Sequence, residues 1–260
     1  MNWRIIHSIL FVPAKRKLLK KIDTICADAF IIDLEDSVKE AGKDNARSEV
    51  SRFLREGTKA NILLRINPAE LETEWSLFDQ FDAIKCIVIP KVETPEDILK
   101  TRNAFPDKSL MALIETPKGM VNLQSILSTN TVSAIGFGAE DYCAITKTCK
   151  TKEYLIPLQS RLVMYGNAYE VPVYDMVNSE FNDKIKYLNY VRIAKDLGFH
   201  GKMAIHPNQI DVINNEFSVT NQEELKKIIQ EYERSSEGFM IIDGKIYEKP
   251  HIEQLKSLLD

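Results

Sequence analysis

The sequence predicts a (β/α)8 barrel, and three observations lead to this prediction. Eight short apolar runs occur along the chain, and each is followed by a segment with helical periodicity. The runs are apolar almost throughout, which is typical of strands that are covered on both faces. The length of 260 residues suits a single barrel domain. A doubly wound open sheet is the alternative, because it shows the same alternation.

The expected strands are spaced so that a helix fits between each pair. In chain order they are residues 8–12, 29–34, 62–66, 86–89, 110–114, 134–138, 171–174 and 202–205. Apolar stripes at helical spacing follow the first, second and fifth strands. They consist of Leu18, Leu19, Ile22 and Ile25, then Ala46, Val50, Phe53 and Leu54, and then Met120, Leu123, Ile126 and Leu127. Thr94, followed by Pro95 and two acids, predicts the start of another helix.

The last expected strand is followed by more chain than a barrel needs. Residues 208–217 predict the closing helix, and Thr220 with Glu223 forms a capping box that predicts one more. A turn at Asp243 and Gly244 precedes a short terminal helix. We therefore expect residues 1–218 to form the barrel, and residues 219–260 to form an extension of the same domain that serves as a lid or an oligomer contact.

The composition is that of an ordinary globular protein, with 44% hydrophobic and 28% charged residues. A net charge of −4 gives no support to nucleic-acid binding. The N-terminal apolar run is too short to span a membrane and carries no cleavage site, so we expect a cytoplasmic protein without membrane contact. The cysteines have no CxxC spacing, and Cys26 and Cys86 are expected to pack as small apolar residues in a reducing compartment. The sequence also lacks phosphate-binding glycine loops and GxSxG motifs.

Nearly every expected strand ends in an ionisable side chain. In a barrel of this type the active site lies at the carboxyl ends of the strands, so these side chains should meet around one mouth. They are Lys15, Arg16, Lys17, Asp33, Glu35, Asp36, Arg65, Lys91, Glu93, Glu115, Glu140, Asp141, Asp175 and His206. A ring of charges on one face favours a functional site over a solvated surface.

The acids of this ring suit a hard cation. Proteins bind Mg²⁺ through one or two carboxylates, while waters and substrate oxygens complete its coordination. Glu115 and one acid of the pair Glu140 and Asp141 could supply these carboxylates. The alternative for the pair is a structural role, because acids also stabilise the first turn of a helix.

Arg65 and His206 each allow two interpretations. Arg65 suits a substrate carboxylate or a developing enolate oxygen, because its fork stays charged and donates two hydrogen bonds. A salt bridge to Asp33 or Asp36 is the alternative. His206 precedes Pro207 and Asn208, so we expect it to form a hydrogen bond at a helix start rather than to act as a base.

Nine segments of the sequence together resemble one protein family. In chain order they are SILFVPA, FIIDLEDSV, NARSEV, LLRINP, CIVIPKVETPEDI, LIETPKGMVNL, IGFGAEDY, LGFHGKMAIHPNQI and DGKIYEKP. The ordered set is similar to the citrate lyase β-subunit-like group of the HpcH/HpaI aldolase superfamily. The resemblance implies a Mg²⁺-dependent (β/α)8 barrel, trimeric or hexameric, that makes or breaks a carbon–carbon bond next to an acyl thioester.

The resemblance also implies roles for individual residues. Glu115 and Asp141 match the metal ligands, and Arg65 matches the residue that contacts the substrate and its enolate. Other matched positions line the mouth or bind coenzyme A: Glu35 and Asp36 at the mouth, Lys17 and Lys21 at the phosphates, and Ile205 and His206 along the pantetheine arm. The spacing of Lys17 and Lys21 would place both on one helical face.

The proton donor that the resemblance implies lies near the C-terminus. In the family an aspartate of a neighbouring subunit protonates the enolate, and Glu248 stands in its place with a side chain that is one methylene longer. His7 stands where the family usually has an arginine, and we expect it on the thioester side of the site.

Together these features predict a Mg²⁺-dependent carbon–carbon lyase. Its substrate would be a citryl, malyl or citramalyl thioester on coenzyme A or on the phosphopantetheine of an acyl-carrier protein. One alternative is a non-catalytic or assembly subunit of a larger lyase complex. Another is a class II aldolase that uses a free α-keto acid, but such enzymes place a base histidine after an early strand, and the DLED strand end has none.

Overall fold

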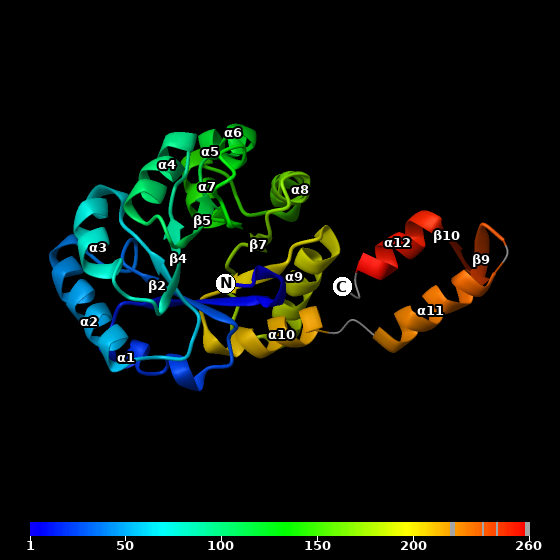
Figure 1. Cartoon of the computed structure of the whole chain (residues 1–260), viewed down its shortest axis with the longest axis horizontal. Helices are drawn as coiled ribbons and strands as arrows, with labels where there is room; N and C mark the ends of the chain where they lie inside the picture. Colours follow the sequence, from blue (N-terminus) through cyan, green and yellow to red (C-terminus); the bar gives the residue numbers. More distant parts are fainter. Residues whose placement is uncertain (219–221, 236, 243, 258–260) are drawn as a thin grey trace. The chain divides into compact units, whose positions relative to one another are not determined.

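The computed structural model describes residues 1–218, 222–235, 237–242 and 244–257. Contacts among them divide the chain into two compact units, Met1–Glu216 and Phe217–Asp260. In the first unit eight parallel strands lie in chain order and the last pairs with the first, so they close into a barrel (Figure 1). The (β/α)8 prediction is therefore confirmed. The open sheet is wrong, because its first and last strands would not pair.

All eight expected strands are present, with ends shifted by at most two residues. They are β1 (Ser8–Pro13), β2 (Ala29–Asp33), β3 (Ile62–Arg65), β4 (Ile84–Ile89), β5 (Ser109–Ile114), β6 (Ala134–Phe137), β7 (Val173–Asp175) and β8 (Gly201–Ala204). The register places Asp33 beside Arg65 and Asp175 beside Lys202. Each of these pairs joins opposite charges on neighbouring strands.

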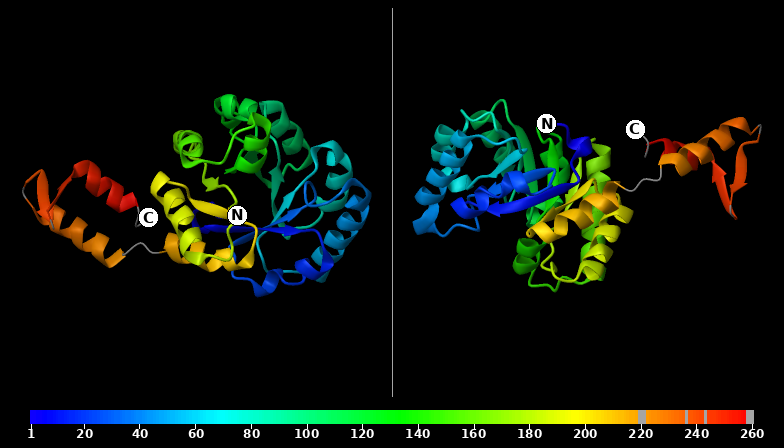
Figure 2. Two further views of the ribbon diagram at one scale, coloured as in Figure 1. Left: turned by 180° about the vertical axis from the view of Figure 1, so that it is seen from behind. Right: turned by 90° about the horizontal axis from the view of Figure 1, so that it is seen from below.

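The α-helices of this unit lie around the outside of the strands (Figures 1 and 2). They are α1 (Arg16–Leu19), α2 (Lys43–Glu56), α3 (Leu71–Phe78), α4 (Pro95–Ala104), α5 (Pro117–Val121), α6 (Leu123–Leu127), α7 (Ala139–Thr146), α8 (Lys152–Ala168), α9 (Lys184–Leu197) and α10 (Ile210–Ser218). Thr94 and Asp97 form a capping box at the start of α4, as expected.

Two expected helices have the wrong extent. The stripe after β1 is divided between α1 and a short 3-10 helix, η2 (Ile22–Thr24). The stripe after β5 is divided between α5 and α6 at Asn122. Apolar spacing predicts which side chains face the core, but it does not reveal that the backbone hydrogen bonds between them are interrupted.

Apolar side chains from the strands fill the interior of the barrel. They include Ile9, Ile31, Leu63, Val88, Met111, Leu113 and Met203, all buried. At the amino ends of the strands, Trp3 packs against Tyr174, whose hydroxyl donates a hydrogen bond to the Ile6 carbonyl at 3.0 Å. At the carboxyl ends the core continues to Phe11 and Val177. Apolar packing thus closes the amino end of the barrel.

Two expectations about individual residues are wrong. Cys86 is buried in the barrel core as expected, but Cys26 is exposed. His7 directly precedes β1, and its ring nitrogen Nδ1 lies 2.9 Å from the His200 carbonyl oxygen, just before β8. His7 is therefore at the amino ends of the strands, away from the side on which a thioester was expected.

The second unit contains α11 (Gln222–Arg234), β9 (Phe239–Ile242), β10 (Lys245–Glu248) and α12 (Lys249–Ser257) (Figure 2, orange to red). β9 and β10 form an antiparallel hairpin. One face of the hairpin packs with Ile228, Ile229 and Ile252, while the other face exposes Phe239, Ile241 and Ile246. The capping residue Thr220 and the turn residue Asp243 lie outside the described residues. Within the described part of the chain, none of the helices has the length and apolar character needed to cross a membrane.

Candidate active site

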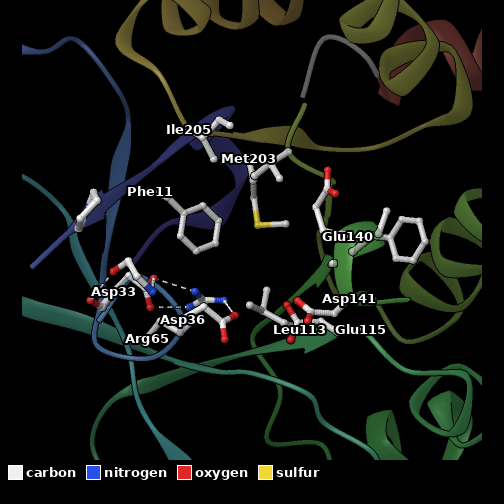
Figure 3. Close-up of a pocket in the computed structure, with 16 residues that line it drawn as sticks. Phe11, Asp33, Asp36, Arg65, Leu113, Glu115, Glu140, Asp141, Met203 and Ile205 are labelled. Atoms are coloured by element: carbon white, nitrogen blue, oxygen red, sulfur yellow. Dashed lines mark hydrogen bonds and ion pairs between the residues drawn. The ribbon is translucent and has the colours of Figure 1, made fainter. Parts of the chain in front are cut away.

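A pocket of about 390 Å³ lies at the carboxyl ends of the barrel strands (Figure 3). Its polar lining residues are Asp33, Asp36, Ser37, Arg65, Glu115, Glu140 and Asp141. Its apolar lining residues include Phe11, Leu113, Phe137, Val177, Met203 and Ile205. Six of the fourteen strand-end side chains that the sequence singled out therefore line one mouth, next to an apolar wall.

Arg65, the last residue of β3, is held by a two-point contact with Asp33 of the neighbouring strand. Its Nε and Nη2 atoms each donate a hydrogen bond of 2.7 Å to the Asp33 carboxylate. The guanidinium also lies 5.2 Å from the centre of the Phe11 ring, within cation–π range. Burial alone would raise the pKa of Asp33, but the hydrogen bonds and charge of Arg65 outweigh it and hold this pKa below its ordinary value.

Further acids surround the remaining edge of Arg65. Its Nη1 atom lies 3.1 Å from Glu35 and 3.3 Å from Asp36. Burial alone would lower the pKa of Arg65, but the hydrogen bonds and charge of Asp33 raise it above its ordinary value. The salt-bridge interpretation of Arg65 is thus confirmed. Arg65 also lines the pocket.

Lys91 connects two groups of this site, although it was expected only as one member of the ring of strand-end charges. Its Nζ atom pairs with the carboxylates of Glu35 and Asp36. Its backbone N–H donates a hydrogen bond of 2.9 Å to Glu115 Oε2. The backbone φ angle of Lys91 is +49°, a left-handed conformation that turns this N–H toward Glu115 and that no pattern of residue types reveals.

Glu115 follows the last residue of β5 and is only 3% exposed. Burial raises its pKa to about 7, and the charges of Asp141 and Glu35 add to this, while Arg65 opposes it. Gly138 provides the space that Glu115 occupies, since a Cβ atom at position 138 would lie 2.3 Å from Glu115 Cγ. The side chain of Glu115 is therefore held between the Lys91 N–H group and a glycine.

Glu140 and Asp141 differ in their surroundings. Both belong to the first turn of α7, which suits their negative charge. Glu140 is exposed and forms an ion pair with Lys150. Asp141 is partly buried, and Figure 3 draws its carboxyl group beside that of Glu115. Of the two acids, Asp141 is the one that lies with Glu115.

The carboxylates of Glu115 and Asp141 fit a Mg²⁺ ion. No group of three or more potential ligands occurs in the described ranges, but Mg²⁺ commonly takes only one or two carboxylates and keeps waters or substrate oxygens. Burial raises the pKa of Glu115, and the negative charge of Asp141 adds to this effect, so the carboxylate of Glu115 is repelled by its neighbour. A divalent cation between them would relieve that repulsion.

The residues that were expected to contact coenzyme A do not all line the pocket. Lys17 and Lys21 are exposed, but α1 ends at Leu19, so the argument that they share one helical face is wrong. Ile205 lines the pocket. His206 Nδ1 accepts a hydrogen bond of 3.2 Å from the Asn208 N–H at the start of the 3-10 helix η5 (Pro207–Gln209), which confirms its helix-entry role.

Asp175 lies outside the mouth, and Glu248 belongs to the second compact unit. Asp175 is 1% exposed and pairs with Lys202 between β7 and β8, so it does not belong to the ring of mouth charges. Glu248 is the last residue of β10 in the second unit, and its side chain is exposed.

The fold and the pocket define an α/β barrel that carries a buried arginine and two neighbouring carboxylates at the carboxyl ends of its strands, where barrel enzymes have their active sites. Residues 7–207 match the HpcH/HpaI aldolase/citrate lyase family, and the chain belongs to this family. The resemblance noted in the sequence is confirmed.

Individual relatives cover nearly the whole chain. A (3S)-malyl-CoA thioesterase of Cereibacter sphaeroides is 30% identical over 95% of this chain and 90% of the relative. Citrate lyase subunit beta of Haemophilus influenzae is 30% identical over 98% of this chain and 96% of the relative. The structure of CitE from Mycobacterium tuberculosis, in complex with magnesium, acetoacetate and coenzyme A, superposes with a TM-score of 0.84 at 22% identity and covers 98% of each chain. The structural likeness supports the fold.

Proposed function

We propose that this protein is a Mg²⁺-dependent carbon–carbon lyase that cleaves a citryl, malyl or citramalyl thioester into an α-keto acid and a shorter acyl thioester. The observation that carries this proposal is the meeting of Glu115, Asp141 and Arg65 in one pocket with an apolar wall. The names of two relatives, a malyl-CoA thioesterase and a citrate lyase subunit, support a thioester of a hydroxy acid as the substrate class.

The side chains of the pocket would divide the work as follows. Glu115 and Asp141 would hold Mg²⁺, which polarises substrate oxygens when it is bound. Arg65 would bind the substrate carboxylate and stabilise the oxygen of the thioester enolate that forms as the carbon–carbon bond breaks. Asp33 keeps the guanidinium of Arg65 in a fixed orientation. The apolar wall at Met203 and Ile205 would exclude water from the enolate.

Glu248 would give the proton that converts the enolate into the acyl thioester. Solvent would take up the proton that the substrate hydroxyl loses as the carbon–carbon bond breaks, and it would return a proton to Glu248. Its side chain lies on the same hairpin face as Phe239, Ile241 and Ile246, because cross-strand partners in the register share a face. Exposed apolar side chains on one face are typical of a surface that another protein covers. We therefore assign residues 219–260 as a lid that covers the barrel mouth of a second copy in a homotrimer or hexamer.

Coenzyme A is the carrier we favour, because the name of the malyl-CoA thioesterase, one of the relatives, contains it. Exposed Lys17 and Lys21 would contact its phosphates, and Ile205 and His206 would line its pantetheine arm. An acyl-carrier protein, or other subunits of a lyase complex, is the alternative partner. The free cysteines support a location in the cytoplasm.

Turnover of defined thioesters tests this function. Citryl-, malyl- and citramalyl-CoA are incubated with the protein and Mg²⁺, and the released keto acid is trapped as a hydrazone. We expect cleavage of at least one substrate, its loss in Glu115→Gln and Asp141→Asn, and its retention in Glu140→Gln, the matched neighbouring acid. Undiminished turnover in the first two variants would contradict the metal assignment. Absence of turnover across the panel, with coenzyme A and acyl-carrier thioesters, would favour the assembly role.

Mixing two inactive variants tests the origin of the proton donor. Glu248→Gln and Asp141→Asn proteins are unfolded together, refolded and assayed. If Glu248 acts in the mouth of a second copy, a random mixture of equal amounts should regain about a quarter of wild-type activity. In such a mixture about a quarter of the sites combine an intact mouth with an intact hairpin from a neighbouring copy. If Glu248 serves its own barrel, the mixture stays inactive.

A further inference from the structure

The segment that leaves β7, residues 176–180, is held at three alternate carbonyl groups by side chains from β8 and from the turn after it. Lys202 Nζ donates a hydrogen bond of 2.7 Å to the Met176 carbonyl. Gln209 Nε2 donates hydrogen bonds of 2.8 Å to the carbonyls of Asn178 and Glu180. We refer to residues 176–180 as the β7 strap.

Gln209 also holds the turn that follows β8. Its Oε1 atom accepts hydrogen bonds from the backbone N–H groups of Ile205 at 2.9 Å and His206 at 3.1 Å. The side chain is 1% exposed, and its two N–H donors and two acceptor lone pairs are all used. Among the side chains of its size, only an amide offers this combination, because a carboxylate has no donor and a methionine has neither group.

The strap is anchored to the barrel wall at its other end. Lys202 is fully buried and pairs with Asp175, the last residue of β7. Asp175 also accepts a hydrogen bond of 2.6 Å from Gln159 of α8. Both carboxylate oxygens of Asp175 therefore accept hydrogen bonds, Oδ1 from Gln159 and Oδ2 from Lys202, which stabilises the buried ion pair. Lys202 fixes the beginning of the strap, and Gln209 fixes its end.

Both segments that Gln209 joins border the pocket. Val177 contributes to the pocket wall from the β7 strap, and Ile205 contributes from the turn after β8. The two segments also meet at the surface, where the ring of His206 stacks on the ring of Phe181 with 4.5 Å between the ring centres. The backbone pairing of β7 and β8 ends at Asp175 and Lys202. Beyond this point Gln209 is a buried side chain that is hydrogen-bonded to both segments.

We propose that Gln209 is a positioning residue that joins the β7 strap and the turn after β8 into one rigid wall of the pocket, and that this wall sets the affinity for the acyl thioester. The second half of this inference rests on the function proposed above. Gln209 touches neither the carboxylates nor Arg65, so its loss should weaken substrate binding and leave the bond-breaking step nearly unchanged.

Two substitutions separate the two halves of this contact. Gln209→Glu keeps the acceptor oxygens for Ile205 and His206 but places a carboxylate against two carbonyl oxygens, so it releases only the strap. Gln209→Leu releases both segments. Asn208→Asp is the matched control, because it makes the same change from amide to acid at the adjacent, exposed position.

Hydrogen exchange of the substrate-free protein tests the wall independently of any activity. In Gln209→Glu we expect exchange at least roughly tenfold faster in residues 176–181 and unchanged exchange at Ile205 and His206, whereas Gln209→Leu accelerates both segments. Asn208→Asp should match the wild type. Unchanged exchange in both Gln209 variants, or acceleration spread evenly over the barrel, would overturn the proposal.

Steady-state kinetics then test the consequence for the substrate. In Gln209→Glu we expect KM for the thioester to rise roughly tenfold and kcat to change less than about twofold. A fall in kcat without a change in KM would overturn the role in binding. If the wild-type protein cleaves no thioester, the proposed function fails, while the exchange experiment still decides whether Gln209 joins the two segments.

Discussion

Gly138→Ala is the sharpest test of how Glu115 is held. The backbone φ angle of Gly138 is −96°, which alanine adopts without strain, so the substitution acts only through its added methyl group. That methyl carbon would lie 2.3 Å from Glu115 Cγ, 2.5 Å from Oε1 and 2.8 Å from Cδ. Ordinary contact between carbon atoms needs about 3.5 Å, so the Glu115 side chain must move by about 1 Å.

This displacement should affect function much more than stability. The atoms that must move belong to a side chain rather than to the backbone, so the fold can accommodate them. The carboxylate would move relative to Asp141 and to the Lys91 N–H group, which now donates to it at 2.9 Å. A misplacement of about 1 Å at a reacting centre costs on the order of a hundredfold in rate. We expect a loss of this size in kcat. We also expect weaker binding of Mn²⁺, which takes the same oxygen ligands as Mg²⁺, measured by isothermal titration calorimetry.

Gly136→Ala is the matched control. Position 136 lies on β6, two residues before Gly138. A Cβ atom there would meet the methyl groups of Leu113 at 2.7 Å and Met111 at 2.8 Å in the core. Overpacking of this kind costs about 1–3 kcal/mol of stability, so this variant should unfold at a lower temperature and bind Mn²⁺ normally. Wild-type Mn²⁺ affinity and kcat in Gly138→Ala would refute the argument that the glycine makes room for Glu115.

Two further predictions concern buried charges. Burial raises the pKa of Glu74 to about 7. As the pH rises from about 5 to 8, the folded protein therefore loses a proton from Glu74 that the unfolded chain has already lost. The contribution of Glu74 lowers the free energy of unfolding by up to about 3 kcal/mol over this range. Urea unfolding should show this decrease in the wild type and in Glu70→Gln, a neighbouring acid on the same arginine. In Glu74→Gln the decrease should be smaller by about this amount, and the part that remains belongs to Glu115, whose pKa burial also raises to about 7. Arg65→Lys keeps the charge but cannot form the two-point contact with Asp33. We therefore expect kcat/KM to fall on the order of a hundredfold. A fall of less than about threefold would argue against a role for the orientation of the guanidinium.

The barrel and the composition of its mouth could be predicted because parallel strands impose a simple geometry. Apolar runs mark the strands, and the carboxyl ends of all strands meet at one face, so Arg65, Glu115 and Asp141 could be expected together. The same reasoning failed for Asp175, which also ends a strand. Its carboxylate meets Lys202 across the strand pair, and only the register reveals that pairing.

The residues that hold the site were harder to find because their signals are conformational. The left-handed backbone of Lys91 and the close approach of Gly138 to Glu115 depend on distances between segments far apart in sequence. The ion pair of Glu140 with Lys150, which distinguishes it from Asp141, also depends on how α7 and the loop after it fold. Gln209 looks like any helix-capping residue until the β7 strap is placed beside it.

The apolar side chains of the barrel interior have a consequence for how this enzyme could change its substrate. Leu113 and Met203 belong to the hydrophobic core and also line the pocket. Enlarging the pocket at either position would remove core volume, and such changes cost about 2–5 kcal/mol. Ile205 is 46% exposed, so its replacement carries a much smaller penalty. Variation in acyl preference among natural sequences should therefore accumulate at the rim of the mouth rather than at its floor.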